Sequence, residues 1–287
     1  MLKRAIIFVH YDKDNLVDDY VYFYLEELQK NSSYLIFVST VKLASETITK
    51  LALLCSKVLM RENVGYDFMS YKVGLESFDY QNYDEVVICN DSVYGPLSPL
   101  KNLFKEMENN TCDFWGITDN TDISYHLQSY FLVFRKRLLQ SKAFKSFWEQ
   151  VKVLNDKKEI IKQYEVGLTQ NLNKDGFKSS IYSNFQPSSM QKVSVFTKKL
   201  TPTKTYKKIV ALIIGQDKLK RIGKLNTTHH FWKELLTSGK MPFIKIELLR
   251  DNPMEMDIKN FEDIVHKISD YDTQLITEHL ARMKEDR

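Results

Sequence analysis

The sequence predicts an α/β fold in which helices flank a mostly parallel sheet. Within the first 140 residues, short apolar runs alternate with amphipathic stretches, which is the pattern of successive βα units. A chain of 287 residues can bury a large core. It holds only 9 glycines and 6 prolines, so long disordered linkers are not expected.

Each element follows from its local pattern. Short apolar runs predict strands at 4–12, 34–40, 57–62, 84–91, 112–118 and 127–136. Apolar residues at helical spacing predict helices at 18–30, 45–56, 67–78, 97–109, 141–154 and 157–174. Further along lie apolar segments at 194–200 and 207–215, a loop at 216–230, helices at 228–237 and 258–285, and PFIKIELLR at 242–250. We place a soft boundary near residue 190. Residues 1–190 then form the main domain, and residues 191–287 form a basic, partly helical extension packed on it.

Charge is unevenly distributed along the chain. The net charge is +4 overall, but it is −2 over 1–191, +11 over 192–250 and −5 over 251–287. Such a basic block suggests an anionic partner, namely a phospholipid surface, a diphosphate or nucleic acid. The alternative is a solvated face that balances acidic neighbours. No signal peptide or apolar run of membrane-spanning length is visible, so we expect a soluble protein. Three cysteines without paired or zinc-like spacing are expected to be buried thiols in a reducing cytosol.

One stretch, YDEVVICNDSVYGPLSPL (83–100), carries the first chemical signal. An apolar run ends abruptly at Asn90, Asp91 and Ser92. Ligands of open α/β sheets bind beyond the carboxyl ends of the strands, where Asp91 would lie. A hard divalent cation prefers oxygen ligands, and one carboxylate is sufficient when substrate phosphates supply the others. Taken alone, the same residues are also typical of a turn.

A second signal lies about 25 residues upstream, in RENVGYDFMSYKVGLESF. It places Asn63, Gly65 and Asp67 at a turn between a strand and a helix. Gly65 suits a tight turn or a close backbone approach. Asp67 opens a helix, where its side chain can act as a cap. The conjunction of this turn with Asp91 is more informative than either alone.

These two features resemble the nucleotide-sugar glycosyltransferases of the GT-A type. In many rhamnosyltransferases an Asn-x-Gly segment lines the nucleotide pocket, and an Asp motif binds the metal-diphosphate. More specifically, the chain is similar to the rhamnan synthesis F family over roughly residues 5 to 280. The blocks that carry the resemblance are NVGYDFMSYKVGLE, CNDSVYGPL, DFWGITDN, HLQSYFLVFRK, FWEQV, YEVGLTQNL and PFIKIELLRDNP, in that order. The chain departs from the general Asp-x-Asp pattern, which is reduced here to Asn-Asp-Ser.

The resemblance implies a bacterial enzyme that transfers L-rhamnose from a dTDP-sugar to a hydroxyl of a growing cell-surface polysaccharide, such as a lipopolysaccharide or capsule, with inversion. A divalent metal, Mg²⁺ or Mn²⁺, would neutralise the leaving diphosphate. We assign Asp91 as its ligand, with Asn90 or Ser92 in support. The acceptor hydroxyl needs a carboxylate base. Glu165, in QYEVGLTQNL, is the first candidate, and Asp113 and Asp119 in CDFWGITDN compete with it. A solvent-facing helix glutamate is the alternative for Glu165.

Other residues receive roles from their chain position. Tyr11 and Asp12, beyond the first strand, would meet the base and ribose of the nucleotide. Lys72 would pair with a phosphate or lie on a solvent face. His126 and Trp115 would contact the sugar, although both residue types are common in cores. His229 or His230 would bind the metal or diphosphate, and the alternative is a helix cap after Thr227 or Thr228.

Two other classes of function compete with an enzyme. One is a partner of a polysaccharide synthesis complex that binds nucleotide sugar or glycan without turnover. The other is a nucleic-acid-binding protein that uses residues 192–250, but the chain has no interleaved aromatic platform and no groove-reading motif, so we expect no nucleic acid partner. The same basic block could dock a cytoplasmic enzyme on anionic lipid at the inner face of the cell membrane.

Overall fold

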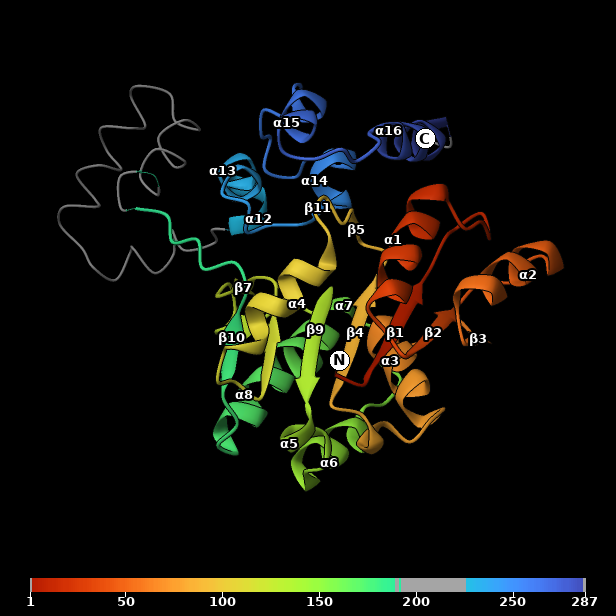
Figure 1. Cartoon of the computed structure of the whole chain (residues 1–287), viewed down its shortest axis with the longest axis vertical. Coiled ribbons are helices and arrows are strands. Elements are labelled where there is room, and N and C mark those ends of the chain that lie inside the picture. Colours follow the sequence, from red (N-terminus) through yellow and green to blue (C-terminus); the bar gives the residue numbers. More distant parts are fainter. Residues whose placement is uncertain (1, 189–190, 192–225, 286–287) are drawn as a thin grey trace.

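The computed structural model describes residues 2–188, 191 and 226–285, and a seven-stranded sheet forms its centre (Figure 1). The strand order is β10-β6-β9-β4-β1-β2-β3. The strands are β1 (Arg4–His10), β2 (Tyr34–Ser39), β3 (Lys57–Met60), β4 (Glu85–Asn90), β6 (Phe114–Gly116), β9 (Phe131–Arg135) and β10 (Ser179–Ile181). All neighbours pair in parallel except β9, which is antiparallel to both β4 and β6. The predicted α/β class with a mostly parallel sheet flanked by helices is confirmed.

Helices cover both faces of the sheet. One face is covered by α1 (Asp19–Lys30), α2 (Ser45–Leu54), α4 (Leu100–Glu108) and the C-terminal helices α13 (Trp232–Thr237), α14 (Ile246–Arg250), α15 (Phe261–Ile268) and α16 (Gln274–Glu285). The other face is covered by α3 (Tyr66–Glu76), α5 (Lys136–Leu139), α6 (Lys142–Gln150), α7 (Lys157–Ile160), the π-helical turn η2 (Ile161–Val166) and α8 (Gly167–Lys174). A 3₁₀ turn η1 (Tyr80–Asn82) and a short helix α12 (Thr227–His230) complete the helices of the described residues.

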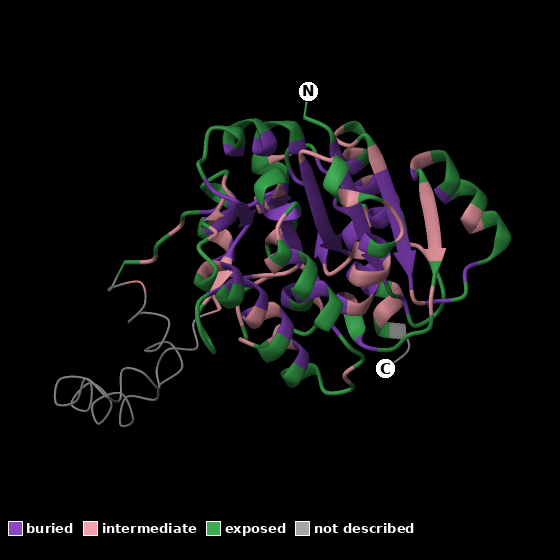
Figure 2. Cartoon of the chain, turned by 90° about the horizontal axis from the view of Figure 1, so that it is seen from below, coloured by how far each residue is buried: buried purple, intermediate pink, exposed green. Residues whose placement is uncertain are grey.

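Because both faces are covered, the central strands read as continuous apolar runs. In β1, Ile6 and Phe8 point into one core, and Ile7 and Val9 point into the other. Figure 2 shows the central strands buried, whereas the edge strand β3 is only half-buried. Helix α3 lies close to β1, since a Cβ added at Gly74 would come within 2.5 Å of Ile7 Cγ2.

The parallel strands direct their carboxyl ends to one edge of the sheet, which we call the carboxyl edge. Two short pairs of strands lie there: β5 (Val93–Tyr94) pairs with β11 (Ile244–Lys245), and β7 (Asp119–Asn120) pairs with β8 (His126–Leu127). The C-terminal helices also lie beyond this edge (Figure 1). Residues of α13, α14 and α16 share one apolar core with β1 and β4, so the C-terminal segment packs directly on the sheet.

Several predicted elements have different bounds in the structure. The strand predicted at 127–136 is interrupted, because Ser129 lies between β8 and β9 and donates its backbone N–H to Glu165 instead of to a neighbouring strand. The helix predicted at 258–285 is two helices, α15 and α16, since Ser269 is extended and Asp272 accepts a hydrogen bond from the N–H of Gln274. The helix predicted at 97–109 begins only at Leu100, after Pro99.

The remaining sequence predictions concern the basic segment, the cysteines and membrane-spanning helices. The segments 194–200 and 207–215 lie outside the described residues, as does 192–225 of the basic block. The three cysteines, Cys55, Cys89 and Cys112, are buried and unpaired, as expected. In the described ranges, no helix combines the length and the apolar character that a membrane span would require.

Candidate functional site

Asp91 is fixed at the carboxyl edge, where β1 and β4 end side by side. Its backbone N–H donates to the carbonyl of Val9, with N and O 3.2 Å apart. Its Oδ2 accepts a hydrogen bond from the backbone N–H of Tyr11 at 2.8 Å. The Tyr20 hydroxyl donates to the carbonyl of Asp91 at 3.1 Å. The backbone of Asp91 is therefore fixed on both sides of its Cα, and its carboxylate is held through Oδ2 by Tyr11.

Asn90 links Asp91 to the start of α3. Its Oδ1 accepts hydrogen bonds from the backbone N–H and the hydroxyl of Ser92, at 3.2 and 2.6 Å. Its Nδ2 donates to Asp67 Oδ2 at 2.8 Å. Asp67 reaches this position because the chain turns sharply at Gly65, where φ is +71°. A side chain at Gly65 would be strained by that φ, and its Cβ would come within 2.3 Å of Met69 Cγ.

Glu165 approaches the same edge from the other side of the sheet. It lies in the π-helical turn η2, and such turns are frequent at functional sites. Its Oε1 accepts hydrogen bonds from the backbone N–H of Ser129 at 2.7 Å and from the Ser129 hydroxyl at 2.8 Å. The carbonyl of Ser129 in turn accepts from the Tyr71 hydroxyl at 3.0 Å. Glu165 Oε1 is therefore positioned by Ser129, and Ser129 is itself held by Tyr71.

Asp67, Asp91 and Glu165, which we call the carboxylate cluster, share one electrostatic environment. Burial raises the pKa of Asp91 well above its ordinary value, and the charge of Asp67 raises it further against the hydrogen bond from Tyr11. Burial also raises the pKa of Asp67, with a further rise from the charge of Glu165, against the hydrogen bond from Asn90. Within the part of the chain that the structure describes, each of the three carboxylates has one oxygen that accepts hydrogen bonds from another residue, and no other residue donates to its second oxygen. A cation or a group with acidic protons would relieve this excess of negative charge.

A second acidic group lies on the loop after β1 and already has a cation. Arg282 of α16 donates from Nε and Nη2 to Asp18 at 3.0 and 2.6 Å, and from Nη2 to Asp12 at 2.6 Å. Asp12, Asp18 and His279 offer ligand atoms within 4.8 Å of one another, a spacing that could hold a metal ion. The guanidinium of Arg282 occupies the cationic position between the two carboxylates, so this group is neutralised by the protein itself.

The amino-acid sequence of this chain is similar to those of known proteins. The model of the family described as rhamnan synthesis protein F matches residues 35–213. Virulence protein VirA of Vibrio anguillarum is 30% identical over 266 residues, which cover 88% of this chain and 81% of that protein. The chain belongs to the rhamnan synthesis F family. Uncharacterized protein y4gN of Sinorhizobium fredii is 28% identical over 166 residues, which cover 55% of this chain and 43% of that protein.

Solved structures resemble this rhamnan synthesis F family member more distantly. The glycosyltransferase GlyE of Streptococcus pneumoniae gives a TM-score of 0.43 at 13% identity, covering 99% of this chain and 64% of that one. A cytidylyltransferase from Leptospira borgpetersenii gives 0.39 at 14% identity, covering 78% and 97%. Glucosyl-3-phosphoglycerate synthase of Mycobacterium tuberculosis, solved with Mn²⁺, UDP and phosphoglyceric acid, gives 0.35 at 8% identity, covering 48% and 57%. The family assignment rests on the sequence matches alone.

The structure brings some of the residues predicted for this family member to the carboxyl edge. Asp91, Asn90, Ser92, Asp67 and Glu165 form the linked group described above. Tyr11 contributes its backbone N–H, and the residue is 51% exposed. Gly65 makes the turn into α3, and Asn63 is an exposed residue of the same turn. Asp12 is buried and bound to Arg282, so its carboxylate holds the loop in place.

Other predicted residues lie apart from the carboxylate cluster. Asp113 accepts two hydrogen bonds from Arg137, at 2.6 and 2.8 Å, and lies next to the amino end of β6, at the opposite edge of the sheet. Lys72 donates to the carbonyls of Glu149 and Val151 at the end of α6. The side chain of Trp115 is 0% exposed and packs against Phe104 and Phe131. The site proposed below therefore leaves out these three residues.

The remaining candidates lie near the carboxyl edge with partners of their own. Asp119 pairs with Leu127 in the β7–β8 hairpin, and burial raises its pKa. His126 is buried in the same hairpin, 2.8 Å from the carbonyl of Ser124 through Nδ1. His229 is buried in α12, with Nε2 3.7 Å from Glu247. His230, the last residue of α12, has Nδ1 3.0 Å from the carbonyl of Asn226, and the residue before the helix is Asn226.

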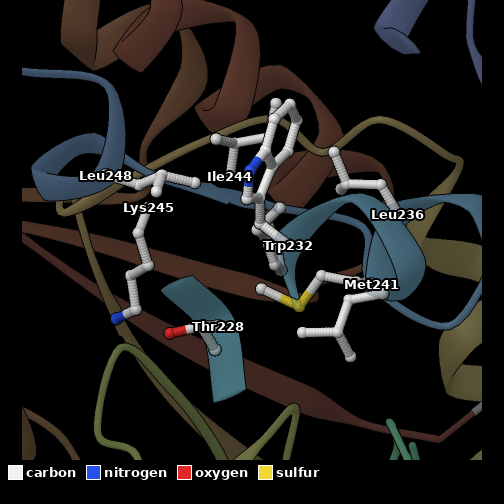
Figure 3. Close-up of a pocket in the computed structure, with 9 residues that line it drawn as sticks. Thr228, Trp232, Leu236, Met241, Ile244, Lys245 and Leu248 are labelled. Atoms are coloured by element: carbon white, nitrogen blue, oxygen red, sulfur yellow. The ribbon is translucent and has the colours of Figure 1, made fainter. Parts of the chain in front are cut away.

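Three residues that shape this edge were not among the predicted site residues. They are Ser129, which positions Glu165, Arg282, which holds the loop after β1, and Lys245, which lies in the family block PFIKIELLR. Figure 3 shows Lys245 at the side of a small, mostly apolar pocket together with Trp232 and Thr228. Its amine end is directed away from the indole of Trp232. Only the resemblance of that block gave a signal for Lys245.

Proposed function

We propose that this protein is a glycosyltransferase of the GT-A-like type that transfers a sugar from a nucleoside diphosphate to a hydroxyl of a lipid-linked surface polysaccharide. L-rhamnose from dTDP-rhamnose is the donor that the family suggests. The observation that carries the proposal is the carboxylate cluster. Asp91 directly after β4, Asp67 in α3 and Glu165 in η2 all lie at the carboxyl edge. Each has one oxygen that accepts a hydrogen bond from another residue and one oxygen that accepts none from another described residue.

Asp91 is the residue we propose for a divalent cation, Mg²⁺ or Mn²⁺. Its Oδ1 is a hard oxygen donor without a protein partner in the described part of the chain, so the residue present fits such an ion. One carboxylate is sufficient when the donor phosphates complete the coordination. When bound, the ion would neutralise charge on the leaving diphosphate. The Asp12–Asp18–His279 group is a poorer candidate because Arg282 already binds two of its members.

Glu165 is the residue we propose as the general base for an inverting transfer. Ser129 fixes Oε1 by two hydrogen bonds, which leaves Oε2 to accept the proton of the acceptor hydroxyl. Asp119 remains the second candidate, on the neighbouring hairpin. The exposed ring of Tyr11, with Asn63 and Gly65, would border the nucleotide, and His126 would border the sugar. Docking on an anionic inner membrane surface through residues 192–250 remains a prediction.

The proposal is tested with the purified full-length chain, dTDP-[¹⁴C]rhamnose and lipid-linked glycan extracted from cells that lack this protein. We expect label to enter the lipid fraction with wild type and not with Asp91→Asn. Binding of the labelled donor without any transfer would contradict an enzyme and favour a non-catalytic binding partner. Absence of binding to dTDP-, UDP-, GDP- and CDP-sugars would contradict the nucleotide-sugar site as a whole.

A further inference from the structure

Lys245 enters the proposed site from a distant part of the sequence. β11 pairs antiparallel with β5, so that Lys245 lies opposite Val93 and Ile244 lies opposite Tyr94. The backbone N–H of Ile246 donates to the carbonyl of Ser92 at 3.1 Å. The backbone of Lys245 is therefore anchored against the segment Ser92–Tyr94, which comes immediately after Asp91.

The ammonium group of Lys245 is held by a ring and not by a carboxylate. Its Nζ lies 3.6 Å from the centroid of the Tyr130 ring, a close cation–π contact. The Tyr130 carbonyl accepts the N–H of Asn90 at 3.3 Å, so the backbone of Tyr130 lies beside the end of β4, one residue before Asp91. Among the described residues, no carboxylate oxygen lies within 4 Å of Nζ, and no hydrogen bond from Nζ is formed.

The surroundings make this charge costly without a ligand. Burial lowers the pKa of Lys245 to about 8, against the attraction of Glu165, Glu247 and Asp67 and with the repulsion of Lys157. His229 also faces it, and burial lowers the pKa of that histidine. An ammonium has three protons to donate, and a half-buried one without acceptors has lost hydration that it does not recover. A lysine that served only to balance Glu165 or Asp67 would be expected to contact one of them.

We propose that Lys245 donates hydrogen bonds to the diphosphate of the nucleotide-sugar donor and stabilises its charge as the sugar leaves. The inference rests on the proposed function and adds a residue to it. Phosphate oxygens supply the acceptors that the ammonium lacks. The anchoring of β11 beside Ser92 and Val93 brings Lys245 next to the segment that follows Asp91, so a diphosphate bound at Asp91 would lie between a carboxylate-held ion and this lysine.

The test is calorimetric titration of dTDP-rhamnose into wild type, Lys245→Met and Lys245→Arg, with Lys240→Met as the control for a lost surface charge. Lys240 lies on the surface, ion-paired with Glu106 of α4. We expect Lys245→Met to weaken binding at least tenfold at pH 7, and Lys240→Met to leave it within twofold. Circular dichroism and melting curves establish that each variant is folded.

A pH series separates binding by the ammonium from a structural role. The diphosphate diester of the donor keeps its charge between pH 7 and pH 9, whereas a lysine with a pKa of about 8 loses its proton in that interval. In metal-free buffer, wild-type affinity for the donor should therefore fall about tenfold from pH 7 to pH 9, and that of Lys245→Arg should not fall. Wild-type-like affinity in Lys245→Met, or identical pH profiles in all variants, would overturn the role of Lys245 alone. Failure of wild type to bind any nucleotide sugar would overturn the proposed function itself.

Discussion

Replacing Arg282 by alanine should destabilise the protein and loosen the proposed site together. Arg282 of α16 donates hydrogen bonds to Asp12, Asp14 and Asp18, all on the loop after β1. The side chains of Arg282, Asp12 and Asp18 are 22%, 7% and 17% exposed. Removing one partner of a buried ion pair costs about 3–5 kcal/mol, and exposed pairs contribute about 0–1 kcal/mol. For this partly buried network we expect a loss of about 2–4 kcal/mol in the free energy of unfolding.

That loss of free energy corresponds to a fall in the melting temperature, Tm. Unfolding entropies near 2.1 cal/mol/K per residue give about 0.6 kcal/mol/K for 287 residues, so Tm should fall by about 3–7 °C. Lys145→Ala, which breaks an exposed pair with Glu149 on α6, should shift Tm by less than about 1 °C. Differential scanning fluorimetry at pH 7.5 compares the two. Equal shifts in both variants would refute the reasoning.

The free energy of unfolding at low pH tests the Arg282 network independently. Burial alone would raise the pKa of Asp12, but Arg282 and the N–H groups of Leu16 and Asp14 hold it below its ordinary value. A carboxylate with a lowered pKa contributes stability above its unfolded-state pKa and loses it as the pH falls through the folded-state value. The free energies of unfolding of wild type and Arg282→Ala should therefore converge as the pH falls below about 4.

Three further outcomes follow from the same geometry. Glu165→Gln removes the proposed base and should slow transfer about 10²–10⁴-fold. It retains an oxygen that can accept the hydrogen bonds from Ser129, so donor affinity in calorimetry should stay within about threefold. A fully active variant would exclude Glu165 as the base. Asp113→Ala removes an ion pair at the opposite edge of the sheet, and its donor affinity should equal that of wild type even if its Tm falls; a loss of donor binding would contradict this placement. Because burial raises the pKa of Asp91, Mn²⁺ affinity measured with dTDP present should rise with pH as that proton is lost, and a flat profile would argue against Asp91 as the ligand.

The central sheet could be predicted because its signal is local. Strands β1, β2 and β4 are buried on both faces and read as unbroken apolar runs. Their alternation with amphipathic stretches indicates parallel βα units. The break at Ser129 could not be read in the same way, since LQSYFLVF is continuous in pattern. It depends on a hydrogen bond to Glu165, which lies 36 residues away.

The candidate site was predictable where residues follow strands and less so where distant segments meet. Asp91 comes directly after β4, and the Gly65 turn opens α3, so both could be placed at the carboxyl edge from sequence. Lys245 reaches that edge only because β11 pairs with β5, and Arg282 only because α16 packs beside α1. Trp115 illustrates the reverse case. A tryptophan suits a sugar face equally well in sequence, but three-dimensional packing buries it completely.

The most direct test of the account is the binding of dTDP-rhamnose with Mn²⁺ to wild type and to Asp91→Asn, measured by calorimetry at pH 7.5. The variant should remain folded and melt no lower than wild type, because a carboxylate whose pKa is raised on folding costs stability once it ionises. We predict that wild type binds the donor more tightly with Mn²⁺ than without it and that Asp91→Asn loses this difference. Equal, metal-dependent binding by a folded Asp91→Asn would contradict the claim that Asp91, at the end of β4, holds the cation that binds the diphosphate.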